Sequence, residues 1–145
     1  GVLPLMNTDV NAYFAQAYFN TAINAYQEEK DFKKAFNFTE KTLYFIPEDT
    51  AILMNAGVFF GPAAEEYEKS IETLKRVISG DAKRHDAYFL IAQSYERLLK
   101  MRAAEEAYEN AVSLNPNSTE YKKHLARLRI ELKIISHETS PASSQ

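Results

Sequence analysis

The chain has 145 residues, of which 46% are hydrophobic and 26% charged, and its formal net charge is −3. This length fits one domain or a short run of repeats, and the composition is close to the average of soluble globular proteins, which excludes a disordered or fibrous chain. The absence of cysteine excludes disulfides, thiolate zinc sites and a cysteine nucleophile, and the acidic balance argues against a general polyanion binder.

Apolar residues recur at helical spacing almost throughout the chain, whereas the alternating apolar and polar runs typical of strands are missing. The first helix is predicted over residues 9–29, with Thr8 or Asp9 as its N-cap. The second helix is predicted over residues 32–46, because the ring of Pro47 ends it. The side chains expected to be buried in this second helix are Phe32, Ala35, Phe36, Leu43 and either Phe45 or Ile46.

In the middle of the chain, glycine and proline residues indicate where two further helices begin and end. A short helix over residues 50–60 is expected to stop at Gly61 and Pro62, and Pro62 suits the first turn of the next helix, over residues 63–79. Gly80 is expected to close that helix in the left-handed conformation. The remaining pattern predicts helices over 84–99, 102–114 and 119–136, followed by a Ser-rich disordered tail over 137–145.

An internal repeat is visible in four pairs of residues of similar type, each separated by 69 positions: Phe19 with Tyr88, Tyr26 with Tyr95, Ala35 with Ala104, and Pro47 with Pro116. This offset predicts two units of about 34 residues with one inserted residue, which is the period of two-helix repeats. The middle unit is supplied by Leu53, Gly57, Phe60, Ser70, Leu74 and Val77.

Over residues 16–116 the chain therefore resembles the tetratricopeptide repeat family. The third unit fits its pattern best, with Tyr88, Ile91, Ala92, Tyr95, Ala104, Tyr108, Ala111 and Pro116. The resemblance implies an all-α, right-handed α-solenoid of about three helix-turn-helix repeats and a C-terminal capping helix. The expected parts are an extension of the first helix (1–15), three repeats (16–49, 50–82 with the insertion, and 83–118), the capping helix (119–136) and the tail (137–145).

Constellations that carry catalysis are missing from the sequence: it has no phosphate-binding glycine loop, no His-Glu-x-x-His pair and no Gly-x-Ser-x-Gly turn. We expect no metal, because Glu120 with His124 is the nearest approach to a ligand pair, and no cofactor. The two acidic clusters, Glu65, Glu66 and Glu68, and Glu105, Glu106 and Glu109, are expected in opening helical turns, where carboxylates favour the helix dipole.

The last predicted helix is basic, but a nucleic-acid surface would also need aromatic side chains among the cations, so no nucleic-acid partner is expected. Its apolar seam, expected to pack on the preceding helix pair, consists of Tyr121, Leu125, Leu128, Leu132 and Ile135. Ile130 and Ile134 fall beside that seam and are candidates for a wider core contact or for self-association as a homodimer.

The family resemblance implies a groove lined by the first helix of each pair, and so a protein or peptide partner. The groove residues carried over are Asn20, Asn24, Gln27, Met54, Val58, Asp86, Phe89, Gln93 and Glu96. A variant of the family clamps a terminal carboxylate with two asparagines and three cations. Here Asn24 and Asn55 match the asparagines, but the cation positions hold Asn20, Asp86 and Leu90, so no clamp is predicted.

We therefore expect a non-enzymatic interaction module that binds a peptide or helix of a partner protein. The alternatives are a structural or oligomerising segment of a larger repeat protein, and an enzyme with a site that its sequence does not reveal. No stretch approaches the roughly 18 apolar residues of a membrane span. A soluble chain is expected, either cytoplasmic or exported with a signal removed upstream of Gly1.

Overall fold

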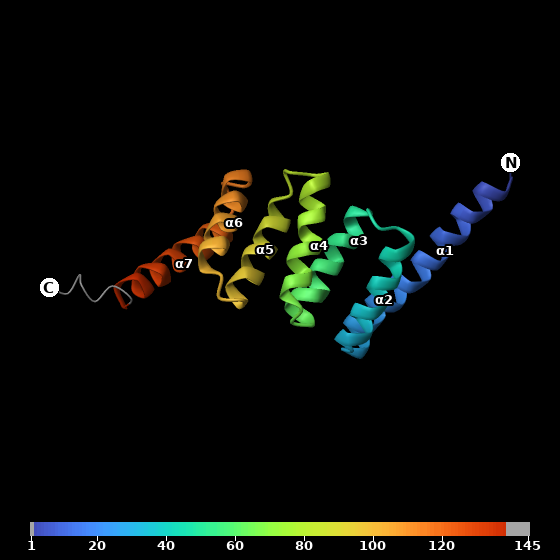
Figure 1. Ribbon diagram of the computed structural model, residues 1–145, viewed down its shortest axis with the longest axis horizontal. Helices are drawn as coiled ribbons and strands as arrows, with labels where there is room; N and C mark the ends of the chain where they lie inside the picture. The colour runs from blue at the N-terminus through green and yellow to red at the C-terminus, as the bar shows by residue number, and fades with distance from the viewer. Residues whose placement is uncertain (1, 139–145) are drawn as a thin grey trace. The chain divides into compact units, whose positions relative to one another are not determined.

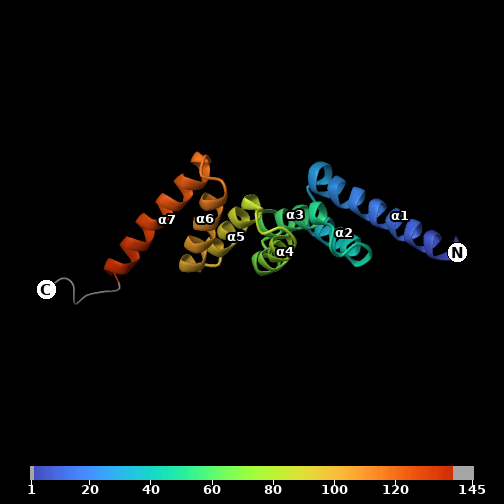
Figure 2. The same ribbon diagram turned by 90° about the horizontal axis from the view of Figure 1, so that it is seen from above.

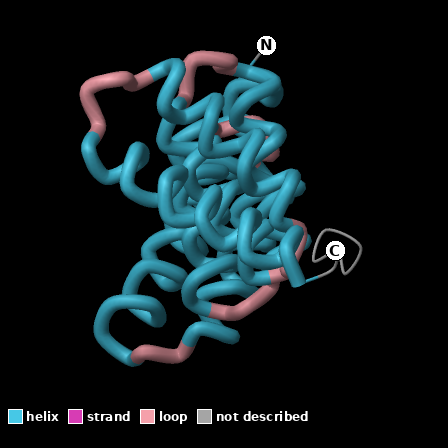
Figure 3. The backbone as a smooth tube through the Cα atoms, turned by 90° about the vertical axis from the view of Figure 1, so that its left-hand side faces the viewer, coloured by secondary structure: helices cyan, strands magenta, loops and turns pink. Residues whose placement is uncertain are grey.

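The computed structural model describes the backbone of residues 2–138 and the side chains of residues 10–61 and 63–138. These residues form helices joined by short connections, as Figure 3 shows. The chain divides into two compact units, Gly1–Ala82 and Lys83–Gln145. Most of the predicted tail, residues 139–145, lies outside the described part, but His137 and Glu138 continue the last helix, so the predicted tail begins too early.

The first unit contains two helical hairpins (Figure 1). In the first hairpin, α1 (Val2–Asn24) continues into a π-helical turn, η1 (Ala25–Glu29), and packs against α2 (Phe32–Phe45). In the second, α3 (Thr50–Val58) continues into the π-helical turn η2 (Phe59–Ala63) and packs against α4 (Tyr67–Gly80). The side chains of Asp31 and Asp49 cap α2 and α3 by accepting the N–H groups of Lys34 and Ile52, each at 3.0 Å.

The prediction that the first helix begins near residue 9 is wrong, because α1 begins at Val2 and Thr8 and Asp9 lie inside it. A residue that can cap a helix does not start one there when the apolar residues before it continue the helical pattern. Pro4 is compatible with this start because the first N–H groups of a helix have no intrahelical acceptor, so a missing one loses no bond.

The helix ends predicted from Gly61, Pro62 and Gly80 in the middle unit are also wrong. Gly61 and Pro62 lie within η2 and separate no helices, and α4 begins only at Tyr67. Gly80 is the last residue of α4 and has no positive φ; Asp81 follows in extended conformation and donates its N–H to the Val77 carbonyl at 2.8 Å.

Within residues 2–138, three residues other than glycine have left-handed backbone conformations: Lys30 (φ 55°), Glu65 (φ 60°) and Leu99 (φ 59°). They follow the first helix of each hairpin and are separated by 35 and 34 residues, the same spacing as the sequence repeat. Each lets the chain reverse direction into the second helix of its pair.

Small residues line the packed face of the first hairpin. Ala22, Ala35, Thr39 and Thr42 are fully buried, and the hydroxyls of Thr39 and Thr42 donate to carbonyls one turn back at 2.8 and 2.9 Å. Side chains of this size let two helices approach closely. Phe32, predicted to be buried, is 37% exposed because it opens α2, where the ring of Tyr26 is its described aromatic neighbour.

The core of the second hairpin agrees with the repeat pattern, since Leu53, Gly57, Phe60, Ser70, Leu74 and Val77 are all buried. Gly57 allows α3 and α4 to approach closely: a Cβ atom there would lie 2.6 Å from Leu74 Cγ. The Ser70 hydroxyl donates to the Gly57 carbonyl at 2.7 Å, which ties α4 to α3 at the same level.

The second unit consists of the hairpin α5 (His85–Arg97) and α6 (Met101–Leu114), with α7 (Thr119–Glu138) packed on it. The predicted seam of α7 is buried from Tyr121 to Leu132, but Ile135 is 43% exposed, which corrects the prediction at its last position. Figure 2 shows the reason: α7 diverges from α6 toward its C-terminal end.

Candidate functional site

A row of exposed amide side chains follows one face of the first helix. Gln16, Asn20, Asn24 and Gln27, called here the amide row, succeed one another at steps of four, four and three residues, so they share a face. Gln16 donates to Asn20 Oδ1 and Asn24 donates to Glu29 Oε1, both at 2.8 Å. Each amide retains further donor or acceptor capacity toward solvent, because a carboxamide has two N–H groups and two lone pairs.

The α3 residues predicted to line a groove, Met54 and Val58, lie one helical turn apart and are half-buried. Their neighbour Asn55 donates to the Ala51 carbonyl at 2.9 Å, so one of its N–H groups is used within its own helix. The first unit thus offers exposed amides on α1 and η1 and partly accessible apolar side chains on α3.

In the second unit, the predicted groove residue Phe89 is covered by α7. Its ring stacks on Tyr121 at 4.6 Å between centroids and meets the edge of His124 at 5.1 Å. Only 9% of Phe89 remains exposed. The seam of α7 therefore occupies the apolar surface that the sequence assigned to a partner.

The predicted groove residue Glu96 is also engaged within the unit. Arg127 of α7 forms a bidentate ion pair with its carboxylate, with N–O distances of 2.8 and 3.0 Å. The Tyr108 hydroxyl donates to the same carboxylate. Burial raises the pKa of Glu96, but the hydrogen bonds from Arg127 and Tyr108 outweigh it and hold that pKa below its ordinary value. Burial, together with the hydrogen bond to Glu96, raises the pKa of Tyr108.

The two remaining groove candidates of α5 are half-buried. Arg84 donates twice to Asp86, both at 3.0 Å, and this hydrogen bonding lowers the pKa of Asp86, so the carboxylate stays ionised. Gln93 is half-buried. Nearby, His85 Nδ1 lies 2.8 Å from the Tyr121 hydroxyl, and burial raises the pKa of that tyrosine.

The sequence did not reveal the residues that close this face of α5. Arg127 lies 31 residues from Glu96, and Tyr121 lies 36 residues from His85, so no local spacing connects them. The apolar seam of α7 could have indicated this coverage, because a helix that buries Tyr121 and Leu125 against a hairpin must cover part of the surface of that hairpin.

The two acidic clusters differ: Glu68 lies in the first turn of α4, as expected, whereas two members of the second cluster form ion pairs outside the first turn of α6, which corrects the expectation there. Glu105 and Glu109 face Arg129 of α7, with N–O distances of 3.3 and 2.6 Å, and neither lies in the first turn of α6. Glu65 has a left-handed backbone ahead of α4, and Glu66 is its N-cap without a side-chain cap.

Among the described side chains, residues 10–61 and 63–138, no group of three or more acidic or histidine side chains is placed to hold a metal ion. His124 stacks on Tyr108 and lies 3.4 Å from Arg127 Nη2. Within the same part of the chain, no helix is long and apolar enough to cross a membrane. Ile130 and Ile134, one turn apart on α7, are 60% and 53% exposed.

Comparison with known proteins gives three kinds of match. Residues 85–118 match the family model described as tetratricopeptide repeat. Protein bimA of Emericella nidulans is 29% identical over 56 residues, which is 39% of this chain but only 7% of that protein.

Solved structures match over most of the chain. The first tetratricopeptide repeat domain of Spaghetti (RPAP3), bound to the HSP90 peptide SRMEEVD, has a TM-score of 0.72 at 16% identity, covering 82% of this chain and 93% of that one. The tetratricopeptide repeat domain of Sgt2 from Aspergillus fumigatus has a TM-score of 0.72 at 19% identity, covering 85% and 82%. At these identities the likeness shows the fold.

Proposed function

Because the chain has the fold of tetratricopeptide repeat domains and carries a repeat of that family at residues 85–118, we propose that it is a non-enzymatic protein-interaction module. Its partner is a peptide or helix of another protein. Two features of the first unit carry the proposal: the exposed amide row on α1 and η1, and the half-buried side chains of Met54 and Val58 on α3. An extended peptide needs main-chain hydrogen-bond partners and shallow apolar contacts, and these side chains supply both.

The second unit, taken by itself, leaves fewer of its predicted groove residues accessible than the family resemblance implies. Phe89 and Glu96 are held by α7, so a partner would meet mainly Asp86 and Gln93 there. We infer that the binding energy comes chiefly from the amides and from Met54 and Val58, whose half-buried side chains leave surface for a ligand to cover.

The partner differs in chemistry from the peptide bound by the Spaghetti domain. That peptide, SRMEEVD, ends in adjacent carboxylates. At the three positions where the clamp variant of the family has cations, this chain has Asn20, Asp86 and Leu90, and Asp86 is ionised. A terminal carboxylate placed there would lack a counter-charge, which is unfavourable on desolvation. We propose a partner segment recognised through amide hydrogen bonds.

The proposal is tested by selecting peptides from a random library on the immobilised chain and measuring the affinity of the selected peptide. The triple variant Asn20→Ala, Asn24→Ala, Gln27→Ala is expected to weaken binding about tenfold or more, as the loss of several hydrogen bonds should. The double variant Asn110→Ala, Asn117→Ala, at exposed amides elsewhere, is the control. Equal affinities of the two variants would refute the assignment.

A second candidate function is self-association through α7, favoured by the exposure of Ile130 and Ile134. Two such side chains one turn apart form a narrow apolar stripe that a second copy could cover. Sedimentation velocity should then show a concentration-dependent dimer that Ile130→Lys with Ile134→Lys abolishes and Tyr44→Lys, at another exposed residue, leaves intact. A native chain that stays monomeric at high concentration would exclude this candidate.

A further inference from the structure

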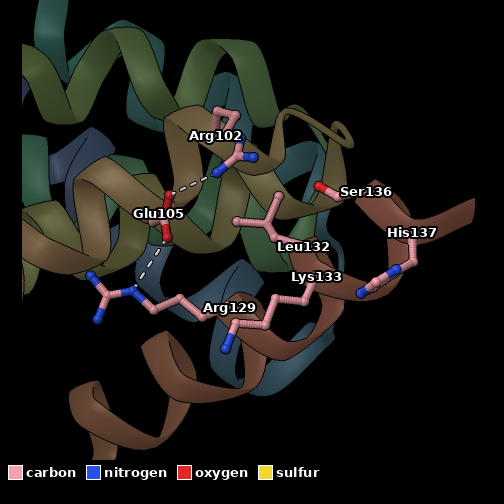
Figure 4. Close-up of a pocket in the computed structure, with 7 residues that line it drawn as sticks. All are labelled: Arg102, Glu105, Arg129, Leu132, Lys133, Ser136 and His137. Atoms are coloured by element: carbon pink, nitrogen blue, oxygen red, sulfur yellow. Dashed lines mark hydrogen bonds and ion pairs between the residues drawn. The ribbon is translucent and has the colours of Figure 1, made fainter. Parts of the chain in front are cut away.

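A hollow of about 520 Å³ lies in the second unit, where α7 diverges from α6. Seven residues of these two helices line it, and Figure 4 shows their side chains around the opening. Its volume falls in the range of ligand-binding pockets, about 300–1,000 Å³. On α7 it extends from Arg129 to His137, about 12 Å along the helix axis.

The charges around this hollow are unbalanced. Arg102, Arg129 and Lys133 bring three positive charges, and Glu105 brings one negative charge. Both arginines turn to this one carboxylate, as the dashed lines in Figure 4 show, with N–O distances of 3.4 Å for Arg102 and 3.3 Å for Arg129. Charge-assisted pairs are normally nearer 2.8 Å, so Glu105 holds neither tightly.

Two of the cations are available to a ligand. The Arg102 side chain is 74% exposed, and Lys133 is exposed and forms no ion pair with any described residue. Arg129, in contrast, is fixed by Glu109 at 2.6 Å. The hollow therefore has one anchored cation and two exposed ones, and the mostly buried Leu132 of α7 also lines it.

We propose that this hollow binds an acidic segment of a partner polypeptide. Carboxylate side chains of the segment pair with Lys133 and Arg102, and an apolar neighbour rests on Leu132. A polypeptide fits better than a small anion, because a length of about 12 Å accommodates three to four extended residues. The proposed cleft is separate from the α5 face, since Arg127 on the other side of α7 is committed to Glu96. The inference therefore goes beyond the proposed function and uses none of its residues.

The test uses the whole chain and isothermal titration calorimetry with a peptide of glutamate and leucine, Ac-ELEELE-NH2, whose amidated end presents no terminal carboxylate. We expect saturable binding that weakens as salt is raised, whereas the glutamine analogue Ac-QLQQLQ-NH2 does not bind. Arg102→Gln with Lys133→Gln should weaken binding at least about fivefold. Glu105→Gln should strengthen it, because the ligand no longer competes with an internal carboxylate.

The matched control is Lys122→Gln with Lys123→Gln, which removes the same charge from exposed positions of α7 outside the hollow. It is expected to change the affinity less than twofold. An equal loss in both double variants, or no binding of the acidic peptide, would overturn the proposal. Complete competition by inorganic phosphate at constant ionic strength would overturn it too, because the hollow would then be a small-anion site.

Discussion

Gly57 gives the sharpest prediction about the packing of the second hairpin. Gly57→Ala places a methyl group 2.6 Å from Leu74 Cγ and 3.1 Å from Leu74 Cδ1, both well inside van der Waals contact. Leu74 is fully buried, so in a close-packed core its side chain can give way only by displacing its neighbours. Such overpacking costs about 1–3 kcal/mol, and alanine returns up to about 1 kcal/mol through its helix propensity. We expect a net destabilisation of about 1–2 kcal/mol.

The assay is urea unfolding followed by circular dichroism, with Gly80→Ala as the control. Gly80 ends α4, is exposed and has no atom within 4 Å of an added Cβ, so alanine there should be neutral or stabilise by about 0.5 kcal/mol. A second background separates the cause. In Leu74→Ala, itself destabilised by about 2–5 kcal/mol, Gly57→Ala should no longer destabilise. If Gly57→Ala were as stable as Gly80→Ala, close packing at this level would be refuted.

Three further predictions follow from the ends and faces of the helices. Leu99→Gly should raise the free energy of unfolding by about 0.5–1 kcal/mol in urea, because Leu99 has φ 59° and is 83% exposed; a decrease would contradict this. The pKa of Glu96 is lower when folded than its ordinary value of 4.5, so its carboxylate stabilises the fold above that value and the gain is lost as pH falls through the folded pKa. Glu96→Gln should therefore flatten the acid limb of the stability curve, and Glu106→Gln, at an exposed residue of α6, should not; parallel curves would count against the Arg127 pair. In the variant Arg102→Gln with Lys133→Gln, which removes the proposed acidic-segment site, the peptide SRMEEVD should show no saturable binding up to millimolar concentration in fluorescence anisotropy, and micromolar binding there would disprove the missing clamp.

The helical hairpins could be predicted from sequence because their cores depend on periodic positions. Gly57, Leu74 and Val77 recur at repeat spacing, and each is buried where the pattern places it. The ends of helices depend on whether a residue caps a helix or continues it, and the repeat pattern does not decide between the two. Thr8 resembles a cap, yet it lies inside α1 because helical residues continue on both sides of it.

The candidate site was harder to predict because its surface depends on contacts between distant residues. Asn20 and Asn24 are exposed as a first-helix face should be. Phe89 occupies an equivalent position but is covered by Tyr121, which lies beyond α6 in the chain. Whether a groove position faces solvent or the chain itself depends on where α7 packs, and no spacing within α5 contains that information.

The extra residue of the second hairpin lies between the start of α3 and Glu65, the segment that contains the π-helical turn η2; the first hairpin has the similar turn η1 without an extra residue. From the first residue of α3 to the left-handed Glu65 there are 15 positions, and from the first residue of α5 to Leu99 there are 14. The added residue lies on the first-helix side of the hairpin, where one turn has widened. Ser70 and Leu74 still meet Gly57 across the pair. The extra residue is accommodated within this segment of the backbone. The contacts between the two helices therefore keep their register.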